Sequence, residues 1–421
     1  MINFLYKLLF KSKNSNYIYR AFNDLGNQFE IKKIFKLINN FSENSEIRYV
    51  GGCVRKIIKK EIVDDIDLAV NLRPKEVCQI FDENRINFYK TGIDHGTITV
   101  IINKKKFEIT SLRKDLKTDG RHAKVEFSDS WYEDASRRDF TINSIYSDIN
   151  GNLYDPFMGK KDIEDGLLKF IGIDEERIKE DYLRILRYVR FFLNYSKSNH
   201  SQKTIRVIKK NIDGISKISS ERLIDEFRKI VKSKGFFKLY KDKFSLEIIS
   251  LIFPQFKNFS ILNNIRKDNY HDLDFVILIA LLIIDKTDNV HYFFYKFNFS
   301  NKDKKRILFI NEFFSKPISK KTFSKENLWK ILYFEGKQSL LDIINFHIFK
   351  SNKKESNLVR MIDFFKDKDA PILPFKAVNL ISKYNLSEGK ELGEKLKKIE
   401  KKWISNNFII SEKEVQKLVM N

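Results

Sequence analysis

Cysteine, proline and tryptophan are scarce in this chain, and long apolar runs are missing. Its 421 residues include two cysteines, six prolines, three tryptophans and 15 glycines. Cys53 and Cys78 cannot supply a disulfide framework, and neither stands at zinc-ligand spacing from another Cys or a His. The longest apolar run, Phe275 to Ile284, has about half the length of a membrane-spanning helix. The sequence therefore predicts a soluble, cytoplasmic protein without a membrane contact, and nothing in it implies a protein partner.

Negative charge is also in short supply. Lys and Arg number 79 against 56 Asp and Glu, so the formal net charge is +23, and the sequence pI is near 9.6. The basic residues are spread over the whole length without a concentrated amphipathic anchor, which favours nucleic acid over an anionic membrane as the partner. A compositional bias toward Lys, Asn, Ile and Phe is the alternative explanation, and it requires no partner.

The apolar pattern divides the chain into two kinds of sequence, and its length suggests two to four domains. Up to about residue 150, β-rich runs predict strands over 47–50, 66–70, 97–102 and 107–110 and helices over 53–60 and 74–84. After a turn at 155–159 the chain reads as successive helices, for example over 177–193, 220–233, 272–285 and 389–404. The expected fold is α+β: a small mixed or antiparallel sheet with flanking helices, followed by an all-α remainder.

The first motif with chemical content is Tyr49-Val50-Gly51-Gly52-Cys53-Val54-Arg55, followed by Asp65-Ile66-Asp67. Paired glycines let backbone amides approach phosphates, and Arg55 adds a charged donor. In a strand, Asp65 and Asp67 would project to the same side, where two carboxylates suit Mg²⁺. Glu108, in a later predicted strand, either completes this site or is a solvated strand residue. A Gly-Gly pair alone is more often only a turn, so the order of the motifs carries the argument.

A second cluster, Glu133 to Asn143, contains Arg137, Arg138, Asp139 and Asn143. The planar fork of arginine matches phosphate oxygens, and a neighbouring Asp or Asn can accept a hydrogen bond from a ribose hydroxyl. A surface cluster of salt bridges would look similar, so both interpretations stay open at this point.

A third cluster lies within the predicted helix 177–193. There Asp181 and Arg184 would be i,i+3 neighbours, either as an ordinary ion pair or as the groups that bond the Watson–Crick edge of a base. Arg187 and Arg190 follow at the same spacing. Each step of three residues falls about 60° short of a full turn, so Arg190 need not share a face with Asp181.

Together these segments resemble the bacterial tRNA nucleotidyltransferase and poly(A) polymerase family, class II, whose members have a nucleotidyltransferase head and a helical neck, body and tail. The resemblance is dense from residue 49 to about 192, and Ile218 to Glu226 looks like the family's neck motif. It implies an N-terminal extension (1–27), a catalytic head (28–155), a neck that recognises the base (156–235) and a tRNA-binding body and tail (236–421).

The resemblance also implies the activity, which is template-independent addition and repair of the 3′-terminal CCA of tRNA from CTP and ATP, with Mg²⁺ as cofactor. Asp65 and Asp67 would hold the metal, and Glu108 would orient the RNA 3′-hydroxyl or act as a base. Asp181 and Arg184 would read the incoming base. The nucleotide-binding set would be Gly51, Gly52, Arg55, Arg137, Arg138, Asp139, Asn143, Asp181, Arg184, Arg187 and Arg190.

Residues 113–123 look like the flexible loop that full CCA-adding members use when they switch from CTP to ATP, with Arg113, Asp115, Asp119 and Arg121 as charged members. An ordinary surface connection is the alternative. Lys56 departs from the family, which usually has Asp at this position. Three rival functions remain: a poly(A) polymerase of the same fold, an enzyme that transfers a nucleotide to a small molecule, and an RNA-binding protein with an inactive head.

Overall fold

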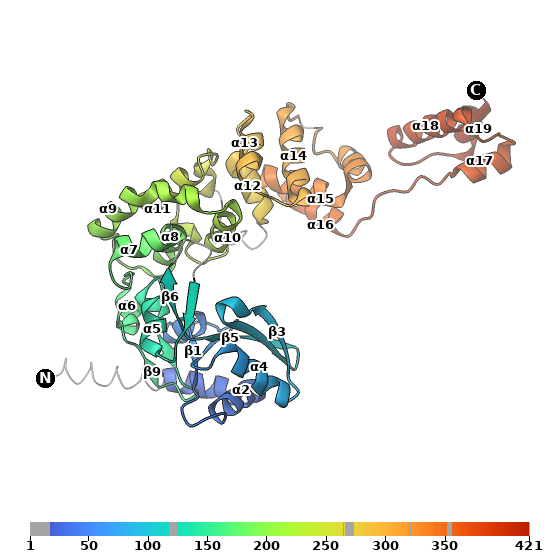
Figure 1. Ribbon diagram of the computed structural model, residues 1–421. Helices are drawn as coiled ribbons and strands as arrows, with labels where there is room; N and C mark the ends of the chain where they lie inside the picture. The colour runs from blue at the N-terminus through green and yellow to red at the C-terminus, as the bar shows by residue number, and fades with distance from the viewer. Residues whose placement is uncertain are drawn as a thin grey trace. The chain divides into compact units, whose positions relative to one another are not determined.

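The computed structural model describes residues 17–117, 124–263, 265, 273–319, 321–351 and 356–420. The chain forms two compact units, Met1–Ile252 and Phe253–Asn421. The first unit contains the sheet and the helices that follow it, and the second unit is helical (Figure 1).

A mixed sheet of seven strands, counted over the described residues, forms the centre of the first unit. Its order is β3 (Asn87–Gly92), β4 (Thr97–Ile102), β5 (Lys105–Ser111), β2 (Asp67–Val70), β1 (Ile47–Val50), β8 (Tyr146–Ser147) and β9 (Leu153–Tyr154). Strands β2 and β5 run parallel, and the other neighbours run antiparallel. The expected mixed sheet is confirmed. A separate two-stranded ribbon pairs β6 (Arg113–Lys117) with β7 (Lys124–Phe127).

Alternation along β5 shows how the sequence sets the two faces of the sheet. Phe107, Ile109 and Ser111 are buried, whereas Glu108 between them is exposed. Helices α2 (Phe29–Asn39) and α4 (Pro74–Glu83) contact each other and cover strands β1, β3 and β4 on one side of the sheet (Figure 1). Helix α3 (Gly52–Ile58) follows β1, and α5 (Trp131–Ser136) leads into the second arginine cluster.

Helices α6 (Gly159–Asp165), α7 (Asp174–Glu180), α8 (Leu183–Tyr195), α9 (Gln202–Asn211), α10 (Ser220–Val231) and α11 (Lys243–Ile252) complete the first unit. Helix α8 packs against α7, α10 and α11. The prediction of one continuous helix over 177–193 is wrong, because the chain leaves the helical conformation at Asp181 (φ −153°, ψ 104°).

The break has a local cause. The carboxylate of Asp181 accepts a hydrogen bond from the backbone N–H of Leu183 (3.2 Å) and another from Arg222 of α10 (2.7 Å). An Asp side chain that bonds nearby backbone competes with a continuous helix. The ring of Tyr182 lies against Gly214, which has no side chain to displace it.

The second unit is built around α12 (Phe275–Ile283), which contacts α14 (Asn301–Ser315) and α15 (Lys325–Ser351). Helix α12 is buried over almost its whole circumference, as its uniformly apolar sequence predicts. It begins at Phe275, three residues later than predicted, and Asp274 caps its N-terminus through Val276 N–H (2.6 Å). Helices α13 (Asn289–Lys296) and α16 (Ser356–Lys366) pack beside α14 and α15, respectively.

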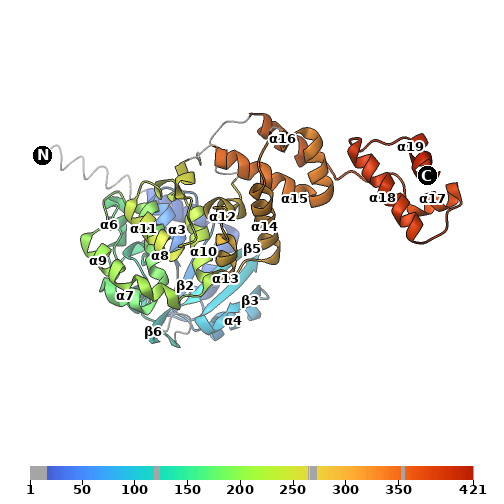
Figure 2. The same ribbon diagram turned by 90° about the horizontal axis from the view of Figure 1, so that it is seen from above.

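The last three helices have their own small core. Leu380 of α17 (Ala377–Tyr384), Leu392 and Ile399 of α18 (Lys390–Ser405), and Val415 and Val419 of α19 (Glu412–Met420) are buried together (Figure 2). Among the described helices of both units, none is long and apolar enough to cross a membrane.

Replacing Gly214 by Ala should destabilise the first unit. A Cβ at this position would lie 2.0 Å from the ring of half-buried Tyr182, so the ring or the backbone would have to shift. We expect a loss of about 1–3 kcal/mol in the free energy of unfolding, measured by urea denaturation. Gly393→Ala in α18 is the matched control, because no atom lies within 4 Å of its Cβ. A Gly214→Ala protein as stable as the parent would contradict this packing.

Candidate active site

A cavity of about 680 Å³ lies in the first unit. Its described lining consists of Gly51, Gly52, Arg55, Asp67, His95, Arg113, Arg137, Arg138, Asp139, Asn143, Glu180, Asp181, Leu183, Arg184, Arg187, Arg190, Phe191 and Arg222. Eight of these residues are arginines, and four carry carboxylates. The structure thus brings together the glycine turn, the second cluster and the third cluster, in a positively charged hollow suited to a polyphosphate.

The two predicted metal ligands do not share a strand. Strand β2 begins at Asp67, so Asp65 and Ile66 precede it, and the predicted start at residue 66 is wrong. The alternation argument therefore does not relate Asp65 to Asp67. Burial, then the charge of Asp65 and then that of Glu108 raise the pKa of Asp67, so both neighbouring carboxylates act on it electrostatically. Glu108 stands directly opposite Asp67 in the parallel pair of β2 and β5.

This group fits a divalent cation. A half-buried carboxylate with a raised pKa beside two others is a place where a cation removes repulsion. In the described part of the chain, no three His, Cys, Asp or Glu side chains form a ready ligand cluster. Mg²⁺ is commonly bound by one or two carboxylates, and water and substrate phosphates complete its coordination shell. Lys56, at the family's usual Asp position, forms an ion pair with Asp64 instead of entering this group.

The glycine turn lies directly against this acidic group. Gly51 has φ +69°, a conformation that other residues adopt only with strain. A Cβ at Gly51 would stand 3.7 Å from Asp67 Oδ2 and 3.9 Å from Arg138 Nη1, and a Cβ at Gly52 would stand 3.8 Å from Asp67 Oδ2. The backbone of the turn, a carboxylate and an arginine therefore converge on one point of the cavity.

Asp134 holds both arginines of the second cluster. Its carboxylate is 1% exposed and pairs with Arg137 (2.6 Å) and Arg138 (3.0 Å), and it accepts a hydrogen bond from Tyr146 Oη (2.6 Å). Burial acts to raise its pKa, but the two guanidinium charges and the Tyr146 hydroxyl outweigh burial and hold it far below the ordinary range. Sequence reasoning assigned no role to Asp134, although its i,i+3 and i,i+4 spacing from two arginines was a signal.

Both carboxylate oxygens of Asp139 accept hydrogen bonds from other residues of the chain. Oδ1 accepts from the side chain of Asn143 (2.7 Å) and from Phe140 N–H (2.9 Å), and Oδ2 accepts from Arg187 Nε (2.7 Å). Asn143 in turn accepts from Arg55. The predicted ribose-side residues Asp139 and Asn143 thus connect the glycine-turn helix to helix α8.

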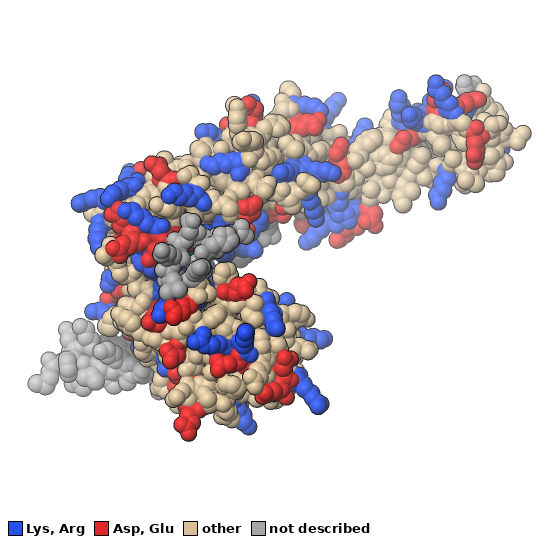
Figure 3. All heavy atoms as spheres, in the orientation of Figure 1, with Lys and Arg blue, Asp and Glu red and all other residues tan. Residues whose placement is uncertain are grey.

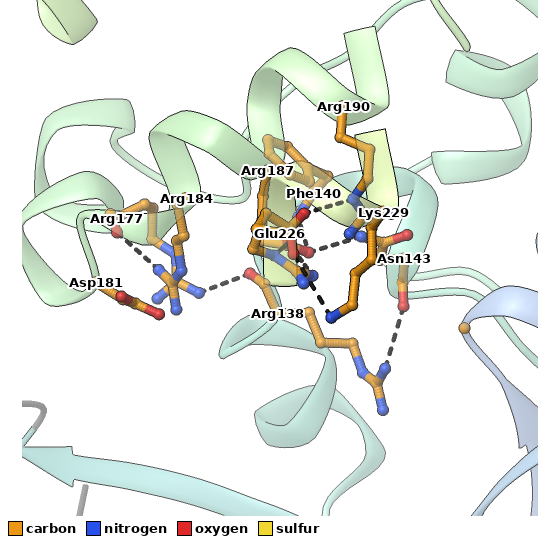
Figure 4. A network of polar contacts seen from close by, with 12 residues as sticks. Arg138, Phe140, Asn143, Arg177, Asp181, Arg184, Arg187, Arg190, Glu226 and Lys229 are labelled. Atoms are coloured by element: carbon orange, nitrogen blue, oxygen red, sulfur yellow. Dashed lines mark hydrogen bonds and ion pairs between the residues drawn. The ribbon is translucent and has the colours of Figure 1, made fainter. Parts of the chain in front are cut away.

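Asp181 and Arg184 both line the cavity and do not pair with each other, so the alternative of an ordinary ion pair between them does not hold. Asp181 bonds Arg222, while Arg184 Nη1 donates to Glu180 (2.7 Å) and to the carbonyl of Arg177 (2.9 Å). Figure 4 shows Asp181 and Arg184 on one side of the arginine network and Arg138 on the other. Arg222 and Glu180 were not predicted. Arg222 lies in the neck-motif segment. Its partner Asp181 is 41 residues away, so the spacing of the two residues in the sequence gave no sign of the contact.

The far side of the network is closed by α10. Arg190 Nε pairs with Glu226, whose side chain is 1% exposed, and Lys229 lies 3.6 Å from the same carboxylate (Figure 4). Arg190 also lies over the ring of Phe191, 4.3 Å from its centroid. Arg190 therefore borders the cavity with its charge already partly balanced.

The predicted flexible loop begins as regular structure. Arg113 and Asp115 belong to β6, so residues 113–117 form a strand where an irregular loop was expected, while Asp119 and Arg121 lie outside the described residues; the predicted role in switching nucleotide stays a prediction. Arg113 lines the cavity and donates to the carbonyl of His95. His95 is a further lining residue that sequence reasoning did not identify.

Acid should weaken the first unit through Asp139. Burial raises the pKa of this carboxyl, but the charge of Arg187 and the hydrogen bonds from Asn143 and Arg187 lower it overall, from 3.8 to about 2. A depressed pKa contributes stability above about pH 4 that is lost as pH falls toward 2. Asp139→Asn should therefore shrink the difference in urea midpoint between pH 5 and pH 3, and exposed Asp129→Asn should not. An unchanged difference in Asp139→Asn would refute the assignment.

Comparisons with known proteins agree with this arrangement. A family model described as the poly A polymerase head domain matches residues 47–169, and one described as a probable RNA and SrmB-binding site of polymerase A matches residues 201–260. The mitochondrial CCA tRNA nucleotidyltransferase 1 of Mus musculus is 30% identical over 381 residues, which cover 89% of this chain and 86% of the relative. The CCA-adding enzyme of Staphylococcus epidermidis is 28% identical over 399 residues, covering 92% and 96%.

Solved structures share the fold. The Bacillus stearothermophilus CCA-adding enzyme in complex with CTP superposes with a TM-score of 0.70 at 20% identity, covering 92% of this chain and 95% of the other. The Thermotoga maritima CCA-adding enzyme complexed with tRNA CCA gives 0.60 at 18% identity, covering 95% and 98%. With the mouse relative matched over most of both chains, this chain belongs to the family of CCA tRNA nucleotidyltransferases, a family of enzymes that use divalent metal.

Proposed function

We propose that this protein adds and repairs the 3′-terminal CCA of tRNA, using CTP and ATP without a template and releasing pyrophosphate. The observation that carries the proposal is the cavity in which the glycine turn, Asp67 and seven arginines lie beside Asp181 and Arg184. The names of the relatives also support it, since they are CCA-adding enzymes. The solved relatives bind CTP in one complex and ATP in another, which favours CCA addition over poly(A) synthesis.

The triphosphate would lie at the convergence of the glycine turn and the arginine pair. Gly51 and Gly52 leave the backbone accessible there, and Asp134 fixes Arg137 and Arg138 in place for the phosphate oxygens. Asp65 and Asp67 would hold Mg²⁺, which when bound polarises a phosphoryl oxygen and lowers the pKa of the attacking hydroxyl. Glu108, on the same face as Asp67, would orient the RNA 3′-hydroxyl.

The base would be read at the break between α7 and α8. Arg222 holds Asp181 as an acceptor, and Glu180 holds Arg184 as a donor. A guanidinium has five N–H groups, so the contacts of Arg184 with Glu180 and with the carbonyls of residues 177 and 137 leave further donors for a base edge. Arg187 and Arg190, on the following turns of α8, would complete the nucleotide-binding set.

We propose the same domains as the sequence predicts: head (28–155), neck (156–235), and body and tail (236–421). The body and tail would bind tRNA through its phosphates. Figure 3 shows Lys and Arg side chains distributed over the visible face of both units, as the net charge of +23 leads one to expect. Both cysteines are buried and free, which supports work in a reducing compartment such as the cytoplasm.

One assay tests the activity directly. The protein is incubated with Mg²⁺ and a tRNA that lacks its last three nucleotides, CTP and ATP are supplied separately and together, and the product ends are sequenced. We expect cytidines from CTP alone and a complete CCA end from the mixture. Long adenylate tails on generic RNA from ATP alone would instead identify a poly(A) polymerase.

Replacing Asp65 or Asp67 by Ala should reduce incorporation to background, because the remaining carboxylate cannot retain the metal. Binding of tRNA should persist and the unfolding midpoint should not fall, since neither aspartate is part of the core and the raised pKa of Asp67 means that its charge costs stability. Asp64→Ala is the matched control: its carboxylate is 72% exposed and faces Lys56, so activity should persist. An active Asp67→Ala protein would refute the assignment of the metal ligands.

Replacing Arg184 by Ala should damage the choice of base more than the rate of transfer. A lost hydrogen bond to a charged donor corresponds to about 1.5–3 kcal/mol, or roughly 10- to 100-fold in discrimination. Misincorporation of UTP and GTP, measured by sequencing product ends, should rise accordingly. Exposed Arg206 on α9 provides the matched Arg→Ala control. Wild-type fidelity in Arg184→Ala would rule out a base-reading role.

A further inference from the structure

A second basic hollow lies in the second unit, where the C-terminal ends of α12, α14 and α15 meet. Its volume is about 490 Å³, and its lining includes Lys286, Phe314, Lys316, His347 and Lys350. A neighbouring hollow of about 270 Å³ is lined by Asn258 and Ser260 and shares Lys286 and Lys350 with the first. The two lysines therefore stand between two connected depressions, well separated in sequence from the catalytic motifs.

The charge of these lysines is not balanced by the protein. No carboxylate is among the described residues that line the larger hollow. Among the described residues, no ion pair joins Lys286 or Lys350 to an Asp or Glu. Asp285, which lines the smaller hollow, accepts hydrogen bonds from the backbone N–H and the hydroxyl of Thr287. Lys350 lies over the rings of Phe346 (5.3 Å) and Phe314 (5.9 Å), and its pKa is lowered by burial and then by the charge of Lys286. Two neighbouring cations, of which Lys350 is partly desolvated, favour an anion between them.

Capping of helix ends does not explain the lysines. Cations are favoured at helix C-termini when the last carbonyls need partners. Here the carbonyls of residues 281–284 at the end of α12 already accept from the side chain of Asn258, the backbone of Lys257 and Asn258, and the side chain of Asn289. At the ends of α14 and α15, the hydroxyls of Ser315 and Ser351 donate to the carbonyls of residues 312 and 348. The ammonium groups are thus left for another partner.

We propose that Lys286 and Lys350, with exposed Lys316 at the rim, bind a backbone phosphate of tRNA. This inference rests on the proposed function. It assigns the tRNA substrate of that function a contact with specific residues of the second unit. The smaller hollow is bordered by Asn258 and Ser260, which lie within the segment 201–260 matched by the RNA-binding family model. Lysines supply point charges that bind phosphate without reading sequence, as a protein acting on all tRNAs requires.

The test compares two double variants of the full-length protein. Lys286→Gln/Lys350→Gln removes both charges from the hollow. Lys302→Gln/Lys305→Gln is the control, because these lysines are exposed near the start of α14, at least nine residues or about 13 Å along the helix from Phe314. The dissociation constant for tRNA lacking CCA is measured by fluorescence anisotropy from 50 to about 300 mM KCl, with the unfolding midpoint of each variant alongside.

We expect the hollow variant to bind tRNA roughly 10-fold more weakly at about 0.1 M salt and to lower the slope of log K against log salt by about 1, as the loss of one phosphate contact predicts. The control should change neither value appreciably. An unchanged slope, or a lowered unfolding midpoint with unchanged binding, overturns the proposal.

Two further arms separate the possible sources of failure. Inorganic phosphate, added at constant ionic strength, should displace tRNA more effectively from the wild-type protein than from the hollow variant, because only the wild-type protein keeps both lysines. Equal displacement from both proteins, or phosphate binding to the wild-type hollow with no change in tRNA affinity in the variant, would overturn the tRNA contact. Nucleotide addition by the wild-type protein is measured on the same tRNA. Active wild-type protein with an unchanged salt slope in the variant refutes this inference alone, whereas tight binding without nucleotide addition refutes the proposed function.

Discussion

The site depends on buried carboxylates that hold arginines in place. Eight arginines around one cavity would repel one another, yet most of those in the centre have a carboxylate of the same unit beside them. Asp134 forms ion pairs with Arg137 and Arg138, Asp139 forms one with Arg187, and Glu226 forms one with Arg190. Because these acids are almost fully buried, the pairs are held in fixed geometry rather than exchanged with solvent. The cavity therefore stays organised for a polyanion before one arrives.

The same pairs join segments that are distant in the chain. Asp139, just after α5, is bound by Arg187 of α8, and Arg177 of α7 donates to the carbonyl of Arg138 (2.6 Å). Asp181 is bound by Arg222 of α10. The predicted head and neck consequently form one compact unit, and the geometry of the phosphate-binding side is coupled to that of the base-reading side.

The sequence was sufficient to predict secondary-structure elements where the signal lies within the element itself. Strands β1 and β4 have the predicted bounds, because runs rich in β-branched and aromatic residues between turn signals determine them. The break at Asp181 could not be predicted, since the local spacing is compatible with a helix and the contact that stabilises the break comes from Arg222. Strand β6 was missed because its charged residues pair with β7 and show no apolar alternation. Arg222 was overlooked as a positioning residue for a related reason, because its partner Asp181 lies 41 residues away. Asp134 and Glu180 were overlooked although the arginines they hold stand three and four residues away.

The continuity of α8 after the break has a mechanical consequence. Arg184, Arg187 and Arg190 project from one rigid helix of 13 residues, and each holds a different neighbour. A small turn of that helix about its own axis would shift all three guanidinium groups at once. An enzyme that must accept a pyrimidine and later a purine would thereby alter the shape of its base pocket and its hold on the nucleotide in a single movement, without the help of a template strand.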